Sequence, residues 1–250
     1  MMNNLNANKA SLARLVATAN RIVIFSGAGI STECGIPDFR SPGGVWERFR
    51  PLDFKTFLSS PQARREGLSR FLNIRKEVGP VKPGRGHKAA AVWHREGKLS
   101  GVITQNIDGL HQAAGVPVSK VVELHGNGTY AHCLDCGERH ELDWIAEQLD
   151  AHPGAPGCVE CGGIVKTATI SFGQPMPQDA MRRAEVMTRE CDLFLAVGSS
   201  LVVQPAASFP VFAVQLKIPM VIINRDPTPA DDLADMVIND DIGSVLEVFL

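Results

Sequence analysis

Residues 21–29 read RIVIFSGAG, an apolar run that ends in a serine and two glycines separated by an alanine. A short continuous apolar run followed at once by glycine is typical of a buried strand that enters a tight turn. Glycine lets the backbone approach a diphosphate, and the exposed amides of such a turn can bind it. The segment predicts a strand followed by a phosphate-binding loop, with a tight turn of no special use as the alternative.

Comparable apolar runs recur along the chain, at residues 101–104, 120–124, 192–197, 219–223 and 236–238. Helical patterns lie between them, at residues 9–17, 62–77, 87–96, 178–190 and 206–216. Strands that are apolar on both faces and alternate with helices are typical of a parallel sheet covered on both sides. We therefore expect an α/β fold with a doubly wound parallel sheet.

Polar segments follow five of these strands, at residues 26–29, 104–108, 123–127, 198–200 and 224–226. Ligands of open parallel sheets bind beyond the carboxyl ends of the strands. The five segments therefore predict a binding site along one edge of the sheet. His125 is the titratable group best placed for general-base chemistry there, because imidazole titrates near neutral pH.

Four of the six cysteines form two CxxC pairs, Cys133 with Cys136 and Cys158 with Cys161. Four thiolates can bind one zinc ion tetrahedrally, and such a closed site is structural because it leaves no position for water. Redox pairs and disulfides are the alternatives. The remaining two, Cys34 and Cys191, are expected to be packing residues. His132 and His140, which flank the first CxxC pair, are expected to lie on the surface.

The stretch that carries these cysteines lacks the alternation of strand and helix, apart from one helical pattern at residues 142–149. We expect a small zinc-binding domain at residues 131–164, inserted into a large domain of residues 1–130 and 165–250. Helices within residues 40–85 are a candidate second part of the small domain.

The charge balance is nearly even, with 25 Lys and Arg against 27 Asp and Glu and a net charge of −2. A nucleic-acid-binding protein usually has a basic surface, so direct binding of nucleic acid is not expected. The N-terminal segment has no apolar core of a signal peptide, and no apolar run is long enough to span a membrane. These features predict a cytoplasmic protein without a membrane partner; they do not indicate its oligomeric state.

The ordered motifs of the chain resemble those of the sirtuins, which are NAD-dependent protein-lysine deacylases. The motifs are GAGIST at residues 27–32, GIPDFRSP at 35–42, TQNIDGLH at 104–111, ELHG at 123–126, the two CxxC pairs, FG at 172–173 and VGSSLVVQPA at 197–206. The resemblance implies a Rossmann-like NAD-binding domain, a zinc ribbon with one structural zinc ion, and an active site between them.

The resemblance also implies a role for each matching residue. His125 would be the general base of the reaction, and Asn106 would be a second catalytic residue. The NAD-binding residues would be Gly27, Ala28, Gly29, Thr32, Asp38, Phe39, Arg40, Gln105, Asn106, Ile107, Asp108, Gly198, Ser199, Ser200, Asn224, Arg225, Asp226 and Ile242. The substrate peptide would be bound by strand addition to Phe172, Gly173, Leu201 and Val202.

The implied reaction transfers the acyl group of an acyl-lysine protein to ADP-ribose and releases nicotinamide and free lysine. Departures from the family pattern at Glu33, Cys34, Thr167 and Gln174 concern substrate preference more than the reaction. In members that remove acidic acyl groups, a tyrosine and an arginine occupy the positions of Leu72 and Arg75 here. We therefore expect a neutral acyl group such as acetyl.

Other functions compatible with the same residues are mono-ADP-ribosyl transfer to protein, hydrolysis of NAD, and a non-enzymatic NAD-sensing module. An ordinary dehydrogenase is a further alternative at the level of the fold. Pro37 and the zinc insert argue against the dehydrogenase, because its glycine loop would continue into a longer helix.

Overall fold

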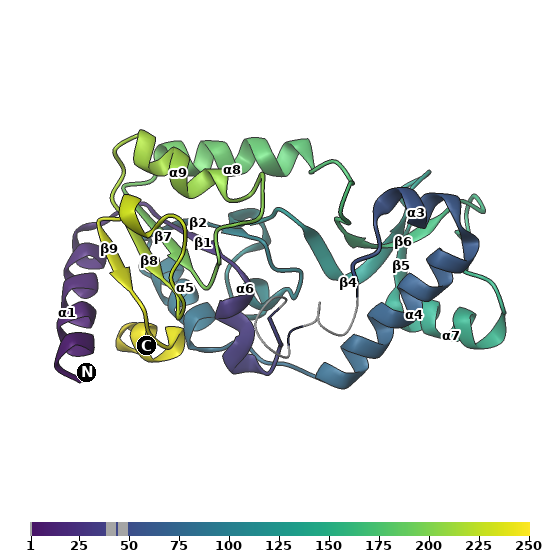
Figure 1. Cartoon of the computed structure of the whole chain (residues 1–250), viewed down its shortest axis with the longest axis horizontal. Coiled ribbons are helices and arrows are strands. Elements are labelled where there is room, and N and C mark those ends of the chain that lie inside the picture. The colour runs from purple at the N-terminus through teal and green to yellow at the C-terminus, as the bar shows by residue number, and fades with distance from the viewer. Residues whose placement is uncertain (1, 39–43, 45–49) are drawn as a thin grey trace.

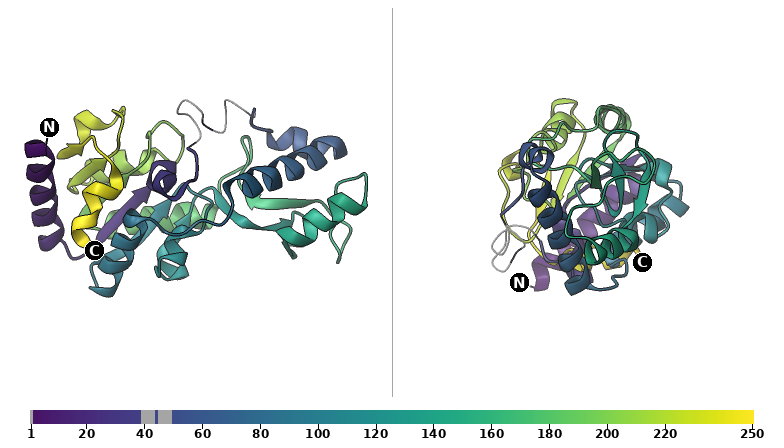
Figure 2. Two further views of the ribbon diagram at one scale, coloured as in Figure 1. Left: turned by 90° about the horizontal axis from the view of Figure 1, so that it is seen from below. Right: turned by 90° about the vertical axis from the view of Figure 1, so that its right-hand side faces the viewer.

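The computed structural model describes residues 2–38, 44 and 50–250, which form an elongated molecule of two lobes (Figures 1 and 2). The large lobe contains a parallel sheet, and the small lobe contains an antiparallel one. Among the described helices, none combines the length and apolar character that crossing a bilayer requires.

Six of the described strands form the parallel sheet, in the order β3-β2-β1-β7-β8-β9. They are β1 (Ile22–Ser26), β2 (Leu99–Thr104), β3 (Val121–Glu123), β7 (Leu193–Val197), β8 (Met220–Ile223) and β9 (Met236–Ile238). The chain winds outward from β1 to β3, returns to β7 beside β1, and winds outward again. This is the doubly wound, Rossmann-like order, and the winding reverses between β1 and β7.

The carboxyl ends of five strands lie in register. Ser26 at the end of β1 pairs with Thr104 of β2 and Val197 of β7. Thr104 in turn pairs with Glu123 of β3, and Val197 pairs with Ile223 of β8. The segments that follow these strands therefore emerge side by side at one edge of the sheet, as the sequence predicts.

Each face of the parallel sheet has its own apolar core, because alternate residues of β1 point to opposite sides. Ile22 and Ile24 pack into a cluster with α1 (Met2–Thr18), α5 (Arg85–Arg95) and α10 (Ile242–Leu246). Val23 and Phe25 pack into a second cluster with α8 (Gln178–Glu190) and α9 (Ser208–Gln215), which Figure 1 shows together along one side. Shorter helices are η1 (Ala28–Cys34), α6 (Leu110–Ala113), η2 (Val118–Lys120), η3 (Asp231–Leu233) and η4 (Glu247–Phe249).

Within the described residues, the small lobe holds three antiparallel strands in the order β5-β4-β6 and three helices. The strands are β4 (Gly126–Cys133), β5 (Arg139–Glu141) and β6 (Val165–Thr169), and the helices are α3 (Phe54–Ser59), α4 (Pro61–Val78) and α7 (Leu142–Ala151). Leu68 of α4 is buried in one apolar cluster with Ala131 of β4 and Ile145 of α7. A segment far upstream in the sequence thus packs into this lobe, as Figure 2 shows.

Sequence patterns miss the three strands of the small lobe. β4 reads GNGTYAHC, in which glycine, asparagine and histidine interrupt the apolar pattern of a strand. The prediction of a surface position for His140 is wrong. Its ring is only 4% exposed and stacks on Trp144 with ring centroids 4.7 Å apart. Cys191 is buried in a large-lobe core, as predicted.

Candidate active site

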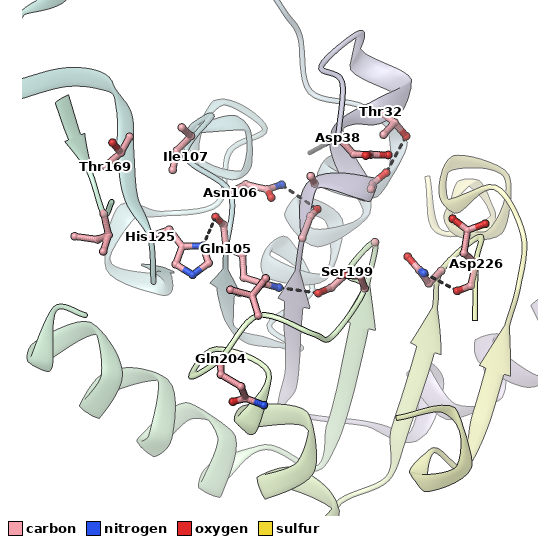
Figure 3. Close-up of a pocket in the computed structure, with 18 of the residues that line it drawn as sticks. Thr32, Asp38, Gln105, Asn106, Ile107, His125, Thr169, Ser199, Gln204 and Asp226 are labelled. Atoms are coloured by element: carbon pink, nitrogen blue, oxygen red, sulfur yellow. Dashed lines mark hydrogen bonds between the residues drawn. The ribbon is translucent and has the colours of Figure 1, made fainter. Parts of the chain in front are cut away.

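A cavity of about 530 Å³ opens at the point where the winding of the parallel sheet reverses. It is lined by the segments after β1, β2, β3, β7 and β8, by the start of α10, and by residues 169–174 at the end of β6. Figure 3 shows Ile107, His125 and Thr169 at one end of the cavity and Asp226 at the other. Both lobes therefore contribute to its walls.

Most residues that the sequence assigns to the site line this cavity. They are Gly27, Ala28, Gly29, Thr32, Asp38, Gln105, Asn106, Ile107, His125, Phe172, Gly173, Gly198, Ser199, Ser200, Asn224, Arg225, Asp226 and Ile242. Asp108, Leu201 and Val202 are not among the cavity-lining residues of the described chain. Phe39 and Arg40 lie outside the described residues.

The glycine loop after β1 packs directly against the loop after β7. Gly198 has a φ of 65°, and a Cβ built on it would lie 2.3 Å from the amide nitrogen of Ile30. The amides of Gly27 and Gly29 donate to the carbonyls of Val197 and Gly198, at 3.1 and 2.8 Å. The amides of these two glycines already have acceptors within the protein, so they are not the exposed amides that a phosphate-binding turn would offer. The glycines allow two loops to meet at the floor of the cavity.

The η1 segment is short, as the sequence predicts from Gly35 and Pro37. It ends at Gly35, which has a φ of 88°. The side chain of Thr32 donates to the carbonyl of Gly29 at 2.9 Å, which closes the turn (Figure 3).

His125 and Gln105 are joined by a hydrogen bond at the base of the cavity. The Nδ1 of His125 lies 3.0 Å from the backbone carbonyl oxygen of Gln105. A carbonyl can only accept, so Nδ1 carries a proton and Nε2 is the acceptor nitrogen of the neutral ring. The side-chain amide of Gln105 donates to the hydroxyl of Ser199 at 2.7 Å, which links this pair to the loop after β7 (Figure 3).

Asn106 is held by a buried network. Its side-chain amide donates to the carbonyl of Gly27 at 3.1 Å and to the hydroxyl of Ser31 at 3.2 Å. Ser31 in turn donates to the carboxylate of Asp108 at 2.7 Å. Asp108 is therefore connected to Asn106 through Ser31, although it is not among the described residues that line the cavity.

Two buried histidines lie below this network, and sequence reasoning assigned them no role. His111 Nε2 lies 2.9 Å from the hydroxyl of Ser26, and the rings of His111 and His87 meet edge to face at 4.8 Å. Burial holds the pKa of His111 well below its usual range and also lowers the pKa of His87. The position of His111 within TQNIDGLH is the one sequence signal that could have indicated its place beside the site.

Other cavity residues were missed because no polar strand end marks them. They are Phe71, Thr169, Ile170, Ser171, Met176, Gln204, Pro205, Pro227, Asp240 and Asp241. Gln174, which the sequence connects with substrate preference, and Val203, which continues the expected peptide-binding segment, also line the cavity. Phe71 comes from α4 of the small lobe, and a Cβ built at Gly128 would lie 3.2 Å from its ring and 3.1 Å from Ile107. The aromatic ring and the isoleucine therefore approach each other over Gly128, and both line the cavity that His125 also lines.

Leu72 and Arg75, which align with the pair that binds acidic acyl groups, are not among the described residues that line the cavity. Leu72 packs instead against the apolar cluster of the small lobe. Arg75 is close enough to Glu141 to contribute to lowering the pKa of that carboxyl, after the larger effect of Arg139. The cavity wall that α4 supplies is thus Phe71, which is apolar and uncharged.

The four cysteines of the CxxC pairs converge in the small lobe, with their sulfur atoms within 4.8 Å of one another. The Sγ atoms of Cys133 and Cys161 are 3.5 Å apart, and those of Cys136 and Cys158 are 3.6 Å apart. Four thiolates around zinc at its usual bond length are about 3.8 Å apart, whereas disulfide sulfurs are about 2.0 Å apart. The geometry fits one zinc ion, and the cysteines of the described chain are free thiols.

Comparisons with known proteins agree with this geometry. The model of the Sir2 family matches residues 27–205. "NAD-dependent protein deacetylase 1" of Bradyrhizobium diazoefficiens is 53% identical over 247 residues, which cover 99% of this chain and 97% of that protein. A Sir2 variant with deacetylated p53 peptide and 3′-O-acetyl ADP-ribose superposes with a TM-score of 0.84 at 33% identity, over 97% of this chain and 96% of that one. A Sir2 complex with p53 peptide and NAD+ gives a TM-score of 0.79 at 34% identity, over 96% and 94% of the two chains.

Proposed function

Because the chain belongs to the Sir2 family, we propose that it is an NAD-dependent protein deacylase that removes acetyl from lysine side chains of proteins. The products are nicotinamide, O-acetyl-ADP-ribose and the free lysine. The observation that carries the proposal is the cavity, in which the ends of five strands meet the small lobe around His125. NAD serves there as a co-substrate that supplies a ribose carbon with nicotinamide as its leaving group.

His125 is proposed as the general base. Its Nδ1–H is fixed on the carbonyl of Gln105, so the opposite ring nitrogen is the one able to accept a proton in the cavity. The proton would come from a ribose hydroxyl of the co-substrate, which makes that oxygen able to attack the acyl carbon. The bond to Gln105 also stabilises the imidazolium that results, because a carbonyl oxygen accepts more strongly from a charged donor.

Asn106 is proposed to orient the nicotinamide-ribose part of NAD. Its side chain is only 7% exposed, and both of its amide hydrogens have acceptors in Gly27 and Ser31. Its carbonyl oxygen is therefore held in a fixed direction. Asp108 supports it through Ser31, and Gln105 and Ile107 complete this end of the cavity. Phe39 and Arg40 are proposed for the same end of the NAD site on the resemblance alone.

The adenosine half of NAD is proposed to lie at the other end of the cavity. Its residues would be Gly198, Ser199, Ser200, Asn224, Arg225, Asp226 and Ile242. The glycine-loop residues Gly27, Ala28, Gly29, Thr32 and Asp38 would contact the middle of the molecule.

The acyl-lysine peptide is proposed to bind between Phe172–Gly173 and Leu201–Val202, at the mouth of the cavity. Phe172 and Val202 are 50% and 49% exposed, so both present apolar surface that a bound peptide could cover. An extended peptide can pair with the backbone of such segments and cover their side chains. Proteins with acetylated lysine are thus the proposed partners.

The small domain is proposed as residues 131–164, with the helices within residues 40–85 as its second part, and the large domain as the rest of residues 1–130 and 165–250. β4 (Gly126–Cys133) crosses these bounds and β6 (Val165–Thr169) lies just beyond them, although both strands belong to the sheet of the small lobe. The shared apolar cluster of Leu68, Ala131 and Ile145 supports the inclusion of the helices. The zinc ion would be held by the four cysteines and would fix the turns that join β4, β5 and β6. Its four sulfur ligands leave no place for a substrate, so its contribution is structural.

Incubation with NAD and a panel of acyl-lysine peptides tests the proposal, with both products measured by mass spectrometry. Release of nicotinamide that requires the acetyl peptide, with equal amounts of O-acetyl-ADP-ribose, is expected. Release of nicotinamide without acyl peptide would indicate NAD hydrolysis. A peptide that gains the mass of ADP-ribose would indicate mono-ADP-ribosyl transfer. Either result, without deacylation, would overturn the proposal.

A further inference from the structure

Glu33, one of the residues that depart from the family pattern, lies in an ionic cluster beside the cofactor loop. The Nε of Arg85 donates to Glu33 at 2.9 Å, while Nη2 donates to Asp241 at 3.1 Å and Nη1 to Glu247 at 3.0 Å. Lys9 of α1 lies 3.1 Å from the second oxygen of Glu247. We call these five side chains the Arg85 cluster. One guanidinium thus joins η1, α5, α10 and η4.

Glu33 also caps helix α5 from a distance. The N-cap of α5 is Gly84, which has no side chain to accept the first amides of the helix. One oxygen of Glu33 accepts from the backbone amide of Arg85 at 2.5 Å, and the amide of Gly86 is 3.4 Å away. A carboxylate at a helix N-terminus is stabilised by these donors and by the helix dipole. The charge of Glu33 therefore holds η1 against the first turn of α5.

The space around Glu33 is shaped for its carboxylate. A Cβ built at Gly84 would lie 2.3 Å from one of its oxygens, and a Cβ built at Gly243 would lie 2.3 Å from the other. Two segments far apart in the sequence thus leave room for the same group. The Glu33 side chain is only 19% exposed, so its pairing with Arg85 is less screened by solvent than a pair of fully exposed surface charges, which is usually of little consequence.

The segments that Glu33 joins carry two walls of the cavity. Ala28, Gly29 and Thr32 of η1 line one wall, and Asp241 and Ile242 at the start of α10 line another. Gly86 of α5 sits between them, since a Cβ on it would lie 2.8 Å from Ile30 and 3.4 Å from Ile242. The distance between the two walls therefore depends on the contacts that Glu33 and Arg85 make.

We propose that Glu33 is a positioning residue for NAD: through Arg85 and the start of α5 it sets the spacing between the η1 wall and the α10 wall of the cavity. The inference rests on the proposed function, because it assumes that NAD occupies this cavity. Glu33 itself is not among the described residues that line the cavity, so its effect is exerted through the two walls.

The test measures the dissociation constants of NAD and ADP-ribose by calorimetry for the wild type, Glu33→Gln, Glu33→Ala and Arg85→Gln. Glu33→Gln keeps an acceptor oxygen and loses the charge, so we expect roughly two- to fivefold weaker binding. Glu33→Ala loses both and should bind more weakly still. Turnover at saturating NAD and the KM for the acyl peptide should stay within about twofold, because the walls reform around bound ligand.

Glu185→Gln is the matched control. Glu185 forms an ion pair of 2.8 Å with Arg189 on α8, and both are about half exposed. The same change of charge there should leave NAD binding unchanged. The double variant Glu33→Gln/Arg85→Gln should bind NAD more tightly than the product of the two single effects predicts, because both single changes remove the same interaction.

Two results would overturn the role of Glu33 alone. In the first, the wild type binds NAD and deacylates, and Glu33→Ala binds NAD equally well but melts at a lower temperature. Glu33 would then be a helix cap without an effect on NAD binding. In the second, Glu185→Gln weakens NAD binding as much as Glu33→Gln does. A wild type that bound neither NAD nor ADP-ribose would overturn the proposed function and this inference together.

Discussion

The Nδ1 of His125 lies 3.0 Å from the backbone carbonyl oxygen of Gln105, so the chain itself selects which ring nitrogen can accept a proton. The same glutamine donates its side-chain amide to Ser199 at 2.7 Å. One residue thus connects the proposed base to the segment that follows β7. The orientation of the imidazole is therefore coupled to the two strands on either side of β1.

Replacement of His125 tests its role as base. His125→Ala should lower the turnover of acetyl peptide by roughly 100- to 10,000-fold, because the general base is lost, while NAD binding stays near that of the wild type. Rates follow from mass spectrometry of the peptide, and binding from calorimetry. His152→Ala is the control, since His152 is exposed in the small lobe. Near-normal turnover in His125→Ala would remove the histidine from the mechanism.

Metal removal tests the cysteine cluster. The purified protein should contain about one zinc ion per chain, and Cys136→Ser should lose most of it. Activity should fall with the metal and return when zinc is restored, because β4 and β6 lead into cavity segments such as residues 169–174. Metal content is measured by atomic emission. Cys34→Ser should retain zinc. A wild-type protein free of metal whose four thiols titrate freely would contradict the assignment.

The buried His111 predicts a loss of stability in mild acid. Its pKa in the folded state is far below 6.5, so below about pH 6.5 the unfolded chain binds a proton that the folded chain does not. The free energy of unfolding should therefore fall as the pH falls from 7.5 to 5.5, by up to about 1.4 kcal/mol per pH unit for this group. His87, whose pKa is also lowered, adds to the effect with the same sign.

The variant His111→Gln separates this effect from others in acid, including protonation of the cysteines. The variant should be less stable than the wild type at pH 7.5, because the substitution disturbs the buried contact with Ser26. Because glutamine does not titrate, it should lose less stability than the wild type between pH 7.5 and 5.5. Urea unfolding at each pH gives both values. Equal losses in the two proteins would show that His111 does not titrate on unfolding.

The apolar wall at Phe71 predicts the choice of acyl group. Succinyl-lysine should react roughly 100-fold or more slowly than acetyl-lysine in kcat/KM, because its carboxylate would be buried without a partner. Phe71→Ala should raise kcat/KM for a longer neutral chain such as hexanoyl, relative to acetyl, by about tenfold. Competition between the two peptides measures the ratio directly. An unchanged ratio would show that Phe71 does not limit the acyl chain.

The sequence predicts the large lobe well, because its strands are continuous apolar runs and their ends are marked by polar residues. The pairing of Ser26 with Thr104 and Val197 explains why the segments after these strands converge. The small lobe is harder to predict, because its order comes from long-range packing and from cysteines, not from apolar periodicity. β4 carries glycine and histidine at positions where a strand usually has apolar residues.

Within the site, sequence reasoning finds residues that follow the parallel strands and misses residues from other elements, such as Phe71 of α4, Thr169 of β6 and Asp240 before α10. Phe71 gives no signal because an aromatic residue on a helix is ordinarily core, and only the tertiary fold brings it to the cavity that His125 also lines. The glycine loop shows the opposite error. Its pattern suggests free amides, yet Gly29 donates to Gly198, a contact between two loops that local sequence cannot indicate.

The position of β1 in the sheet also determines when the sheet can form during translation. Its neighbour β7 is far downstream: the amide of Asn20, just before β1, donates to the carboxylate of Asp192, 172 residues later. At roughly 5–20 residues per second, a ribosome needs about 10–35 s to make that stretch. The small-lobe strands β4 to β6 are all translated during this interval. The nascent chain can therefore acquire its metal and fold the small lobe before the sheet beneath the cavity is complete.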